Sequence, residues 1–526
     1  MDILNLLART NKWYLAGGKG ALYAPPNPLR LLTAGFWDEC YFADIRLEHL
    51  FTVFFIPKNG KPLSLQSELM EWRPDRIVIH HHHSAGILKE TRCVTSAQTW
   101  ISIFERNDSE PLDILVWSLQ KPLKETSGII HAPAENPSSR ARALSWEHKI
   151  HWAQPSEEWR LGTETVTELI PVHLTKVDQK GSLFIALGAN LRRTSFAVCP
   201  SDPHTTKPSW ENCPARELLT PKGLKPIFKR KTLGHLHLLQ HYRWTSGEPL
   251  KVVACADTSR SSALSSLHKE LQRDSLRAST RSWEKFFKSV PQFTCSDEFI
   301  TRYYWYRWYV LFLNAVEVRL GNLSYPCTFE GIGPFRNLIA YSAPAHTREA
   351  LWINGGELAR GIIQNFLNAQ REDGSFPGHI YSLRTPRDFY HTNWGDALDA
   401  LISLWQPQNI QQILSGFEKY ADFLDTACDT ERSGMIDVIS QHETGQEYSP
   451  RYLFANPNAD QDLPFIIKGV DATYYALRLR TVLTHWFREL GDETTALKNL
   501  KRLSQLRKGL LKHMGTPKKD SSKMFY

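Results

Sequence analysis

Residues 259–287 read SRSSALSSLHKELQRDSLRASTRSWEKFF, and the hydrophobic period of the chain changes within this stretch. Leu264, Leu267 and Leu271 recur every three or four residues among charged and polar side chains. This spacing puts apolar side chains on one side of a helix. The stretch therefore marks the point where strands give way to helices.

Before this stretch the apolar residues alternate with polar ones, as at Leu112, Ile114 and Val116. A period of two is typical of strands with one buried face. Turns rich in Pro, Gly, Asn and Asp separate the alternating segments from one another. These segments are 95–106, 114–120, 182–189 and 233–244. The pattern predicts an antiparallel β-sandwich, with a long surface loop over 198–226 where Pro, Ser, Thr and Asn are dense.

After residue 296 the spacing is helical almost throughout. The predicted helices span 298–319, 346–354, 356–370, 394–405, 408–427, 470–490 and 493–514. We therefore expect a β-sandwich domain over 1–260, a linker helix within 261–295 and a helical domain over 296–526.

The charge balance gives little sign of a nucleic-acid partner. The 63 Lys and Arg residues exceed the 55 Asp and Glu residues by eight, spread thinly along 526 residues. Two basic clusters, 222–231 and 498–523, lack interleaved aromatic side chains and any nucleic-acid motif. They are predicted to be solvated faces.

Cysteine usage and the absence of apolar runs bear on the compartment. The eight cysteines are dispersed singly, with no Cys-x-x-Cys pair and no histidine at metal-ligand spacing. We therefore expect reduced thiols in the cytoplasm, with no metal and no cofactor. No basic, apolar leader or eighteen-residue apolar window occurs, so no signal peptide and no membrane partner are expected. The four histidines at 80–83 are interpreted as the polar end of a strand.

Residues 442–452, HETGQEYSPRY, carry the chemistry that we consider most informative. Hydrolysis of a glycosidic bond needs one protonated carboxyl group to donate to the leaving oxygen and a second carboxylate across the ring. Glu447 is the candidate donor, Tyr448 offers a flat face to a sugar ring, and Arg451 offers a fork of donors. Glycine and proline predict a loop here. On these residues alone, a solvated surface pair of glutamates is the commoner reading.

A second candidate stretch is YSAPAHTREALW, residues 341–352. In a helix His346, Glu349 and Trp352 would share one face, because residues three and four apart are neighbours. That face would line a sugar subsite together with Arg348. A surface ion pair between Arg348 and Glu349 explains the same residues equally well.

The third candidate stretch contains Tyr390, His391, Trp394 and Asp396, just before and within a predicted helix. A helix cap explains one polar residue there but not all four. A stacking ring beside hydroxyl-binding Asp and His is what a sugar site requires. Asp471 begins a later helix, where a helix N-terminus favours a carboxylate without any catalytic role.

The segment 443–447, Glu-Thr-Gly-Gln-Glu, and Ser-Pro-Arg at 449–451 resemble the signature of clan G glycoside hydrolases, families 63 and 37. In that signature, Glu-Ser-Gly-x-Asp carries the general acid. The resemblance extends more loosely from residue 299 to the end and implies a β-sandwich followed by an (α/α)6 toroid. It assigns the acid to Glu447, where the family has Asp, and a supporting role to Glu443.

The resemblance also implies an inverting mechanism, with the two carboxyl groups ~6.5–9.5 Å apart to admit a water molecule. The family's base lies in the last part of the toroid. The pattern predicts fewer helices than six hairpins require, so we expect a C-terminally incomplete toroid whose base lies beyond residue 526.

The resulting hypothesis is an inverting exo-glycosidase acting on a small glucoside, mannoside or oligosaccharide. One alternative is a polysaccharide lyase, because some lyases pair helical toroids with β-sandwiches and use Tyr, His and Arg against uronates. The other is a non-catalytic glycan-binding remnant. In all three readings the expected partner is a carbohydrate.

Overall fold

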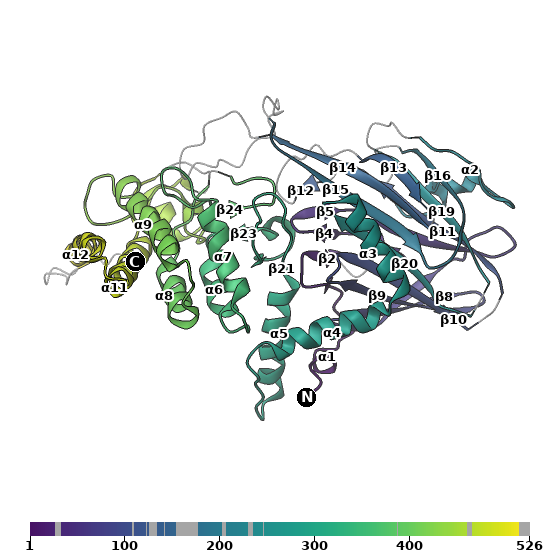
Figure 1. The fold of residues 1–526 in the computed structure, drawn as a ribbon, viewed down its shortest axis with the longest axis horizontal. Coiled ribbons are helices and arrows are strands. Elements are labelled where there is room, and N and C mark those ends of the chain that lie inside the picture. The colour runs from purple at the N-terminus through teal and green to yellow at the C-terminus, as the bar shows by residue number, and fades with distance from the viewer. Residues whose placement is uncertain are drawn as a thin grey trace. The chain divides into compact units, whose positions relative to one another are not determined.

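The computed structural model describes the chain except residues 27–32, 108–109, 122–123, 126–133, 141, 154–176, 202–206, 230–234, 246, 387, 460–464 and 515–526. The chain divides into two compact units (Figure 1). The first consists of Met1–Ala153, Val177–Gly321 and Gly331–Arg336, and the described part of the second of Asn322–Glu330 and residues 337–514. The ends of both basic clusters, 230–231 and 515–523, lie outside the described residues.

Antiparallel sheets dominate the first unit. The eight-stranded sheet has the order β13 (Ala134–Arg140), β14 (Ala143–Ala153), β15 (Val177–Ala189), β20 (Leu250–Asp257), β10 (Thr99–Arg106), β9 (Gly86–Thr95), β8 (Arg76–His83), β7 (Gln66–Arg73). A five-stranded sheet has the order β16 (Arg193–Pro200), β19 (Leu236–Trp244), β11 (Leu112–Gln120), β6 (Phe51–Ile56), β3 (Gly35–Phe36). A second five-stranded sheet has the order β1 (Leu15–Ala16), β2 (Ala21–Tyr23), β4 (Cys40–Phe42), β5 (Ile45–Leu47), β12 (Lys124–Glu125), and α1 (Ile3–Leu6) precedes it.

The eight-stranded sheet and the sheet that contains β11 pack face to face. Phe55 of β6 lies edge-on to Phe104 of β10, with ring centroids 5.2 Å apart. The indole N–H of Trp146 on β14 donates to the Gln120 side chain on β11 over 3.1 Å. Large rings that fill the space between two sheets are typical of sandwich cores. The predicted β-sandwich is confirmed.

Residues 259–287 form two helices rather than one linker helix. The first, α3 (Arg260–Gln272), packs on β15 and β20, where Leu267 is fully buried. The Asp274 side chain then accepts a hydrogen bond from the Arg277 backbone and starts α4 (Ser275–Lys288). A new N-cap interrupts the helix although the leucine spacing continues.

The next helix, α5 (Glu298–Leu313), belongs to the first unit. Its aromatic side chains stack on α4: Phe312 lies 4.1 Å from Phe286, and Tyr309 lies 5.4 Å from Trp283, centroid to centroid. The sequence pattern assigned this helix to the helical domain, because spacing alone does not show which surface a helix covers.

The expected long loop over 198–226 is wrong. This region contains the end of β16, a 3-10 turn (Trp210–Asn212), α2 (Ala215–Leu218) and the hairpin of β17 (Leu219–Thr220) and β18 (Gly223–Leu224). Cys213 and Ala215 are buried in the cluster that contains Trp117. A few apolar residues anchor a segment whose overall composition is polar.

The four histidines end β8, as predicted, and His81 is buried. Its Nε2 lies 2.8 Å from the Glu90 carboxylate. Glu90 also accepts hydrogen bonds from the Arg92 guanidinium over 2.9 Å and from the Ser102 hydroxyl over 2.6 Å. Although burial opposes ionisation, Arg92 and His81 lower the pKa of Glu90 to about 2.

The second unit is helical. Its described helices are α6 (Ala343–Ala350), α7 (Glu357–Asn368), α8 (Trp394–Trp405), α9 (Ile410–Ala427), α10 (Pro450–Ala455), α11 (Val470–Glu489) and α12 (Glu493–Met514). Its short strands are β22 (Cys327–Thr328), β23 (Leu338–Ile339) paired with β24 (His379–Ile380), and β25 (Asp437–Val438) paired with β26 (Ile467–Lys468).

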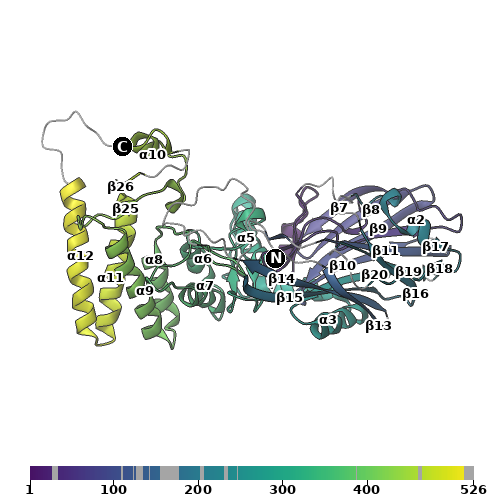
Figure 2. The same ribbon diagram turned by 90° about the horizontal axis from the view of Figure 1, so that it is seen from above.

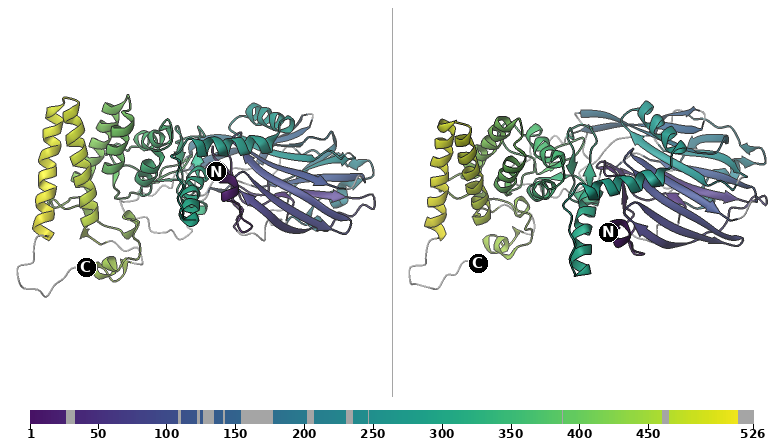
Figure 3. Two further views of the ribbon diagram at one scale, coloured as in Figure 1. Left: turned by 90° about the horizontal axis from the view of Figure 1, so that it is seen from below. Right: turned by 60° about the horizontal axis from the view of Figure 1, so that its bottom comes forward.

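The helices of this unit form two rows. In one row α6 contacts α8, and α8 contacts α11; in the other α7 contacts α9. The hairpins α6–α7 and α11–α12 link the rows, and α11 and α12 run side by side along their length (Figure 2). Figure 3 shows these helices following one another in chain order, from green to yellow. Alternate helices in two rows are the repeat expected of an (α/α) toroid, which agrees with the predicted fold class.

No described helix combines the length and the hydropathy needed to cross a bilayer.

We expect Glu90→Gln to destabilise the sandwich by about 3 kcal/mol or more at pH 7, because Arg92 would remain buried without its counter-charge. The folded pKa of Glu90 lies below its unfolded value, so its contribution is present above pH ~4.5 and is lost as the pH falls toward 2. Urea unfolding at several pH values measures both effects. Glu68→Gln is the control, because Glu68 lies 3.6 Å from His82 in an exposed pair and should cost less than ~0.5 kcal/mol. Equal losses in the two variants would contradict this account.

Candidate active site

The candidate site lies in the second unit, where the segments that precede α6, α8 and α11 converge. The Thr392 hydroxyl, just before α8, donates to the carbonyl of Tyr341, just before α6, over 3.1 Å. Glycine at 445 passes against the Tyr341 ring, and Gln446 donates to the Asp471 carboxylate in the first turn of α11 over 3.3 Å. Three helix N-termini and the acidic segment 441–452 therefore share one end of the row.

The acidic segment is more regular than the predicted loop. A 3-10 turn covers Gln441–Glu443, and α10 begins at Pro450, whose fixed φ suits the first position of a helix. The Gln441 side chain accepts from the Tyr448 backbone over 2.8 Å and donates to the Ala459 carbonyl over 2.9 Å. The sequence predicts that Pro450 interrupts helical structure, whereas in the structure Pro450 begins α10.

Glu443 fixes this segment from within. It is 1% exposed, and its carboxylate accepts from the Ile439 backbone over 3.0 Å and lies 3.7 Å from His391 Nε2. The Glu443 carbonyl also accepts from the His391 backbone over 2.7 Å. These contacts join the acidic segment to the residues before α8.

Gly445 is required by two features of the backbone. Its φ is +60°, a left-handed conformation that side chains other than glycine adopt at a cost. A Cβ at this position would lie 2.6 Å from the Tyr341 ring. The chain can therefore pass Tyr341 only because residue 445 has no side chain.

Glu447 is half-buried beside Tyr341. Burial, followed by the negative charges of Asp471 and Glu447, raises the pKa of Tyr341. Among the described residues, none donates a hydrogen bond to the Glu447 carboxylate or pairs with it. Glu447 thus differs from Glu443, whose carboxylate is buried and bound.

Arg451 holds the opposite side of the cluster. Its guanidinium donates to the Asp471 carboxylate over 3.0 Å and to the Tyr452 hydroxyl. Although burial acts against the charged form, these two hydrogen bonds raise the pKa of Arg451. Asp471, for which a helix N-terminus alone was a sufficient explanation, is the partner that orients Arg451. Tyr448 is 71% exposed, with a positive φ, and its ring is open to solvent.

Tyr390 connects this cluster to a second one that the sequence did not reveal. Its ring centroid lies 6.0 Å from that of Tyr341 and 5.6 Å from that of His379. His379 Nε2 lies 3.1 Å from the Asp388 carboxylate. Burial raises the pKa of Asp388 to about 7, although Arg371 opposes the shift. The pairing of β23 with β24 positions His379, and no spacing in the sequence predicts it.

Trp394 is buried away from any site surface, and Asp396 is held in an ion pair. Trp394 is 1% exposed and packs edge-on against Phe366 at 4.9 Å, so neither face of its ring is open to a sugar. Asp396 forms an ion pair with Arg478 of α11 at 2.7 Å. Burial opposes ionisation, but Arg478 and then Asn393 lower the pKa of Asp396. Both residues stabilise the contact between α8 and its neighbours.

The α6 residues are only partly brought to the site. The helix ends at Ala350, so Trp352, which is 60% exposed, does not share a helical face with His346 and Glu349 as predicted. Arg348 is exposed and contributes weakly to lowering the pKa of Asp396. His346 and Glu349 are half-buried on α6.

Within the described part of the chain, no three His, Cys, Asp or Glu side chains are grouped closely enough to hold a metal ion.

No protein-family model and no curated protein matches the sequence. Solved structures match it at low identity. A GH92 family α-mannosidase from Bacteroides thetaiotaomicron, in complex with mannoimidazole, is 12% identical, over 96% of this chain and 63% of its own, with a TM-score of 0.52. Another GH92 family glycosyl hydrolase is 10% identical, over 96% of this chain and 63% of its own, with a TM-score of 0.51. A putative kojibiose phosphorylase from the human microbiome is 9% identical, over 86% of this chain and 59% of its own, with a TM-score of 0.52.

The chain therefore spans less than two thirds of the length of these three structures. The likeness shows the fold, in which antiparallel sheets precede a helical domain. This is a glycoside-hydrolase-like fold.

We expect Gly445→Ala to destabilise the site by more than the left-handed φ alone requires. Gly333 is the matched control, because its φ is +61° and a Cβ there would meet nothing within 4 Å. Gly333→Ala should cost about 1 kcal/mol, whereas Gly445→Ala should cost about 2–3 kcal/mol. Denaturant unfolding and hydrogen exchange of the segment 441–452 measure the difference. Similar losses would show that Tyr341 does not constrain the segment.

We expect Asp388→Asn to change how stability depends on pH. The folded pKa of Asp388 lies above its ordinary value of 3.8, so ionisation costs wild-type stability as the pH rises from ~4 to ~7. The variant lacks this cost and should gain on wild type across that window, by roughly 4 kcal/mol at most. Unfolding curves at pH 4, 5.5 and 7.5 measure the gain. A constant difference at all three values would contradict the raised pKa.

Proposed function

We propose that the protein is a glycoside hydrolase in which Glu447 is the general acid. The observation that carries the proposal is the half-buried, unpaired carboxylate of Glu447 beside Tyr341, at an end of the helical row where three helix N-termini meet. The other glutamate of the segment, Glu443, is bound by the backbone of Ile439 and so has the supporting role. General acids need an unoccupied carboxyl group within reach of the leaving oxygen.

The surroundings of Glu447 suit a sugar. Tyr341 and Tyr390 offer adjacent rings, and the half-exposed guanidinium of Arg451 is oriented by Asp471. Aromatic faces beside charged hydrogen-bonding groups are the usual composition of small-ligand sites. We propose that the substrate is a small glucoside or mannoside, cleaved from its end and with inversion, as the clan G signature implies.

The lyase alternative is less consistent with the same residues. A tyrosine base abstracts a proton most readily when its own pKa is lowered. Burial and the charges of Asp471 and Glu447 instead raise the pKa of Tyr341. The raised pKa favours a neutral Tyr341, which in hydrolysis would stack on a sugar ring or donate a hydrogen bond to it.

We expect Glu447→Gln to reduce hydrolysis of alkyl glucosides or mannosides by two to four orders of magnitude, because no group then protonates the leaving oxygen. Dinitrophenyl glycosides, whose leaving group needs no proton, should lose much less. The measurement is kcat and KM on both substrate classes for wild type and variant.

Two controls accompany this test. Glu372→Gln alters an exposed glutamate of the same unit and should leave both rates unchanged. Glu443→Gln should lower the hydrolysis rates of both substrate classes alike, because the carboxylate that binds the Ile439 backbone and holds the segment would be lost. A wild type that hydrolyses no glycoside, or a Glu447→Gln variant with full activity on alkyl glycosides, would refute the proposal. Unsaturated products from uronate polymers would support the lyase instead.

A further inference from the structure

An open cavity of about 710 Å³ lies in the second unit, lined by residues of α9, the loop 428–434, α11 and α12. This volume falls in the range of small-molecule sites. None of the residues that form the candidate active site lines it. Six of its lining side chains are cationic: Arg432, Arg480, Lys498, Arg502, Lys508 and Lys512.

The carboxylates of this cavity are already neutralised by cations. Asp422 accepts from Arg480 over 2.7 Å and from Lys498 over 2.9 Å. Asp425 lies 2.8 Å from Arg502 Nε and also pairs with Arg480. These pairs account for three of the six cationic side chains in the lining.

The other three cations, Arg432, Lys508 and Lys512, are exposed and have no carboxylate partner among the described residues. Lys508 and Lys512 lie one turn apart on α12, where like charges repel. The helix dipole favours a cation in the last turn and so explains Lys512. It does not explain Arg432, which lies outside any helix.

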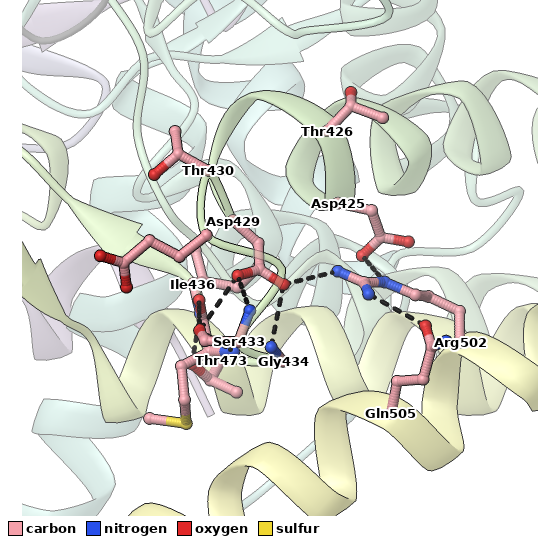
Figure 4. Close-up of polar contacts among 12 residues, drawn as sticks. Asp425, Thr426, Asp429, Thr430, Ser433, Gly434, Ile436, Thr473, Arg502 and Gln505 are labelled. Carbon is pink, nitrogen blue, oxygen red and sulfur yellow. Dashed lines mark hydrogen bonds and ion pairs between the residues drawn. The ribbon is translucent and has the colours of Figure 1, made fainter.

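A hydrogen-bonded loop places Arg432 in the same cavity lining as these lysines. The Asp429 carboxylate accepts from the Ser433 backbone over 2.8 Å and the Gly434 backbone over 3.0 Å, and from Arg502 over 3.0 Å (Figure 4). A Cβ at Gly509 would lie 2.4 Å from the Gly434 carbonyl oxygen, so the loop backbone touches α12 beside Lys508.

The loop also holds Arg432 in a conformation that arginine rarely adopts. Its φ is +53°, which costs of order 1 kcal/mol for a side chain other than glycine. Such conformations persist where the surroundings impose them, and they cluster at ligand sites. Beside the loop, the side-chain oxygen of Gln505 on α12 accepts a hydrogen bond from Arg502 over 3.0 Å (Figure 4).

We propose that this cavity binds a small phosphate monoester, with Arg432, Lys508 and Lys512 around the phosphate group. Three cations without a carboxylate partner among the described residues favour a ligand with more than one negative charge, and Arg and Lys are the residues that recognise phosphate. The cavity has room for a sugar-sized group attached to the phosphate. The site is distinct from the Glu447 cluster, and its existence does not depend on hydrolysis by the protein.

The test is isothermal titration calorimetry of the full chain with glucose 6-phosphate, inorganic phosphate and glucose. Glucose 6-phosphate should bind more tightly than inorganic phosphate, and glucose should not bind. Arg432→Gln and Lys508→Gln should each weaken glucose 6-phosphate binding at least about tenfold, because each removes a charged hydrogen bond. The control is Lys501→Gln on α12, which alters an exposed lysine outside the cavity and should leave affinity unchanged.

Three results would overturn the proposal. The first is no binding of either phosphate compound at millimolar concentration by a folded wild type. The second is an equal loss in Lys501→Gln and Lys508→Gln, which would indicate attraction by net charge alone. The third is tighter binding of a short oligonucleotide than of glucose 6-phosphate, which would assign the surface to a polyanion. The unfolding midpoint of each variant without ligand separates lost binding from lost folding.

Discussion

The candidate active site depends on the burial of Glu443. A buried carboxylate needs polar partners, and here the Ile439 backbone donates a hydrogen bond over 3.0 Å while His391 Nε2 lies 3.7 Å away. The backbone of the same glutamate binds the backbone of His391. One side chain thus fixes both the acidic segment and the entrance to α8. Glu447 lies four residues further along this anchored segment.

The two-row packing of helices makes this anchoring possible. Because α6, α8 and α11 contact one another in turn, the segments that enter them meet at one end. Two kinds of contact hold the row in place: buried Trp394 packs among phenylalanines, and half-buried Arg478 of α11 pairs with Asp396 and Asp399 of α8. These residues resemble site residues in sequence because they are aromatic or charged. Their function is to keep the helices in register.

Sequence periodicity predicted the elements whose packing it directly reflects. The helix over 394–405 and the helix over 493–514 match α8 and α12 at both ends, and the alternating strands form the sandwich. It failed where one residue has two readings. Pro450 breaks a helix in the middle but starts one at its first position, so α10 was missed. Asp274 interrupts a continuous leucine spacing with a new cap.

The site was predictable in its segments but not in its geometry. The acidic segment, Tyr390 and His391 were found because their residue types are unusual together. The sequence did not predict which residues contact them. The packing of α6 positions Tyr341, and the register of β24 positions His379. Glu443 and Glu447 lie in the same polar segment, and only the tertiary structure shows which of the two is buried.

Many carboxylates of the second unit are held by arginines. Asp396, Asp422 and Asp429 each bind an arginine, and each has a pKa lowered by hydrogen bonds against the effect of burial. Such carboxylates are ionised, occupied and poor proton donors. The same reasoning applies to cations, since Arg478 and Arg502 are held by carboxylates and Lys508 is not. Charged groups left without a partner in otherwise paired surroundings carry an electrostatic cost, and a ligand of opposite charge or a reacting substrate removes it.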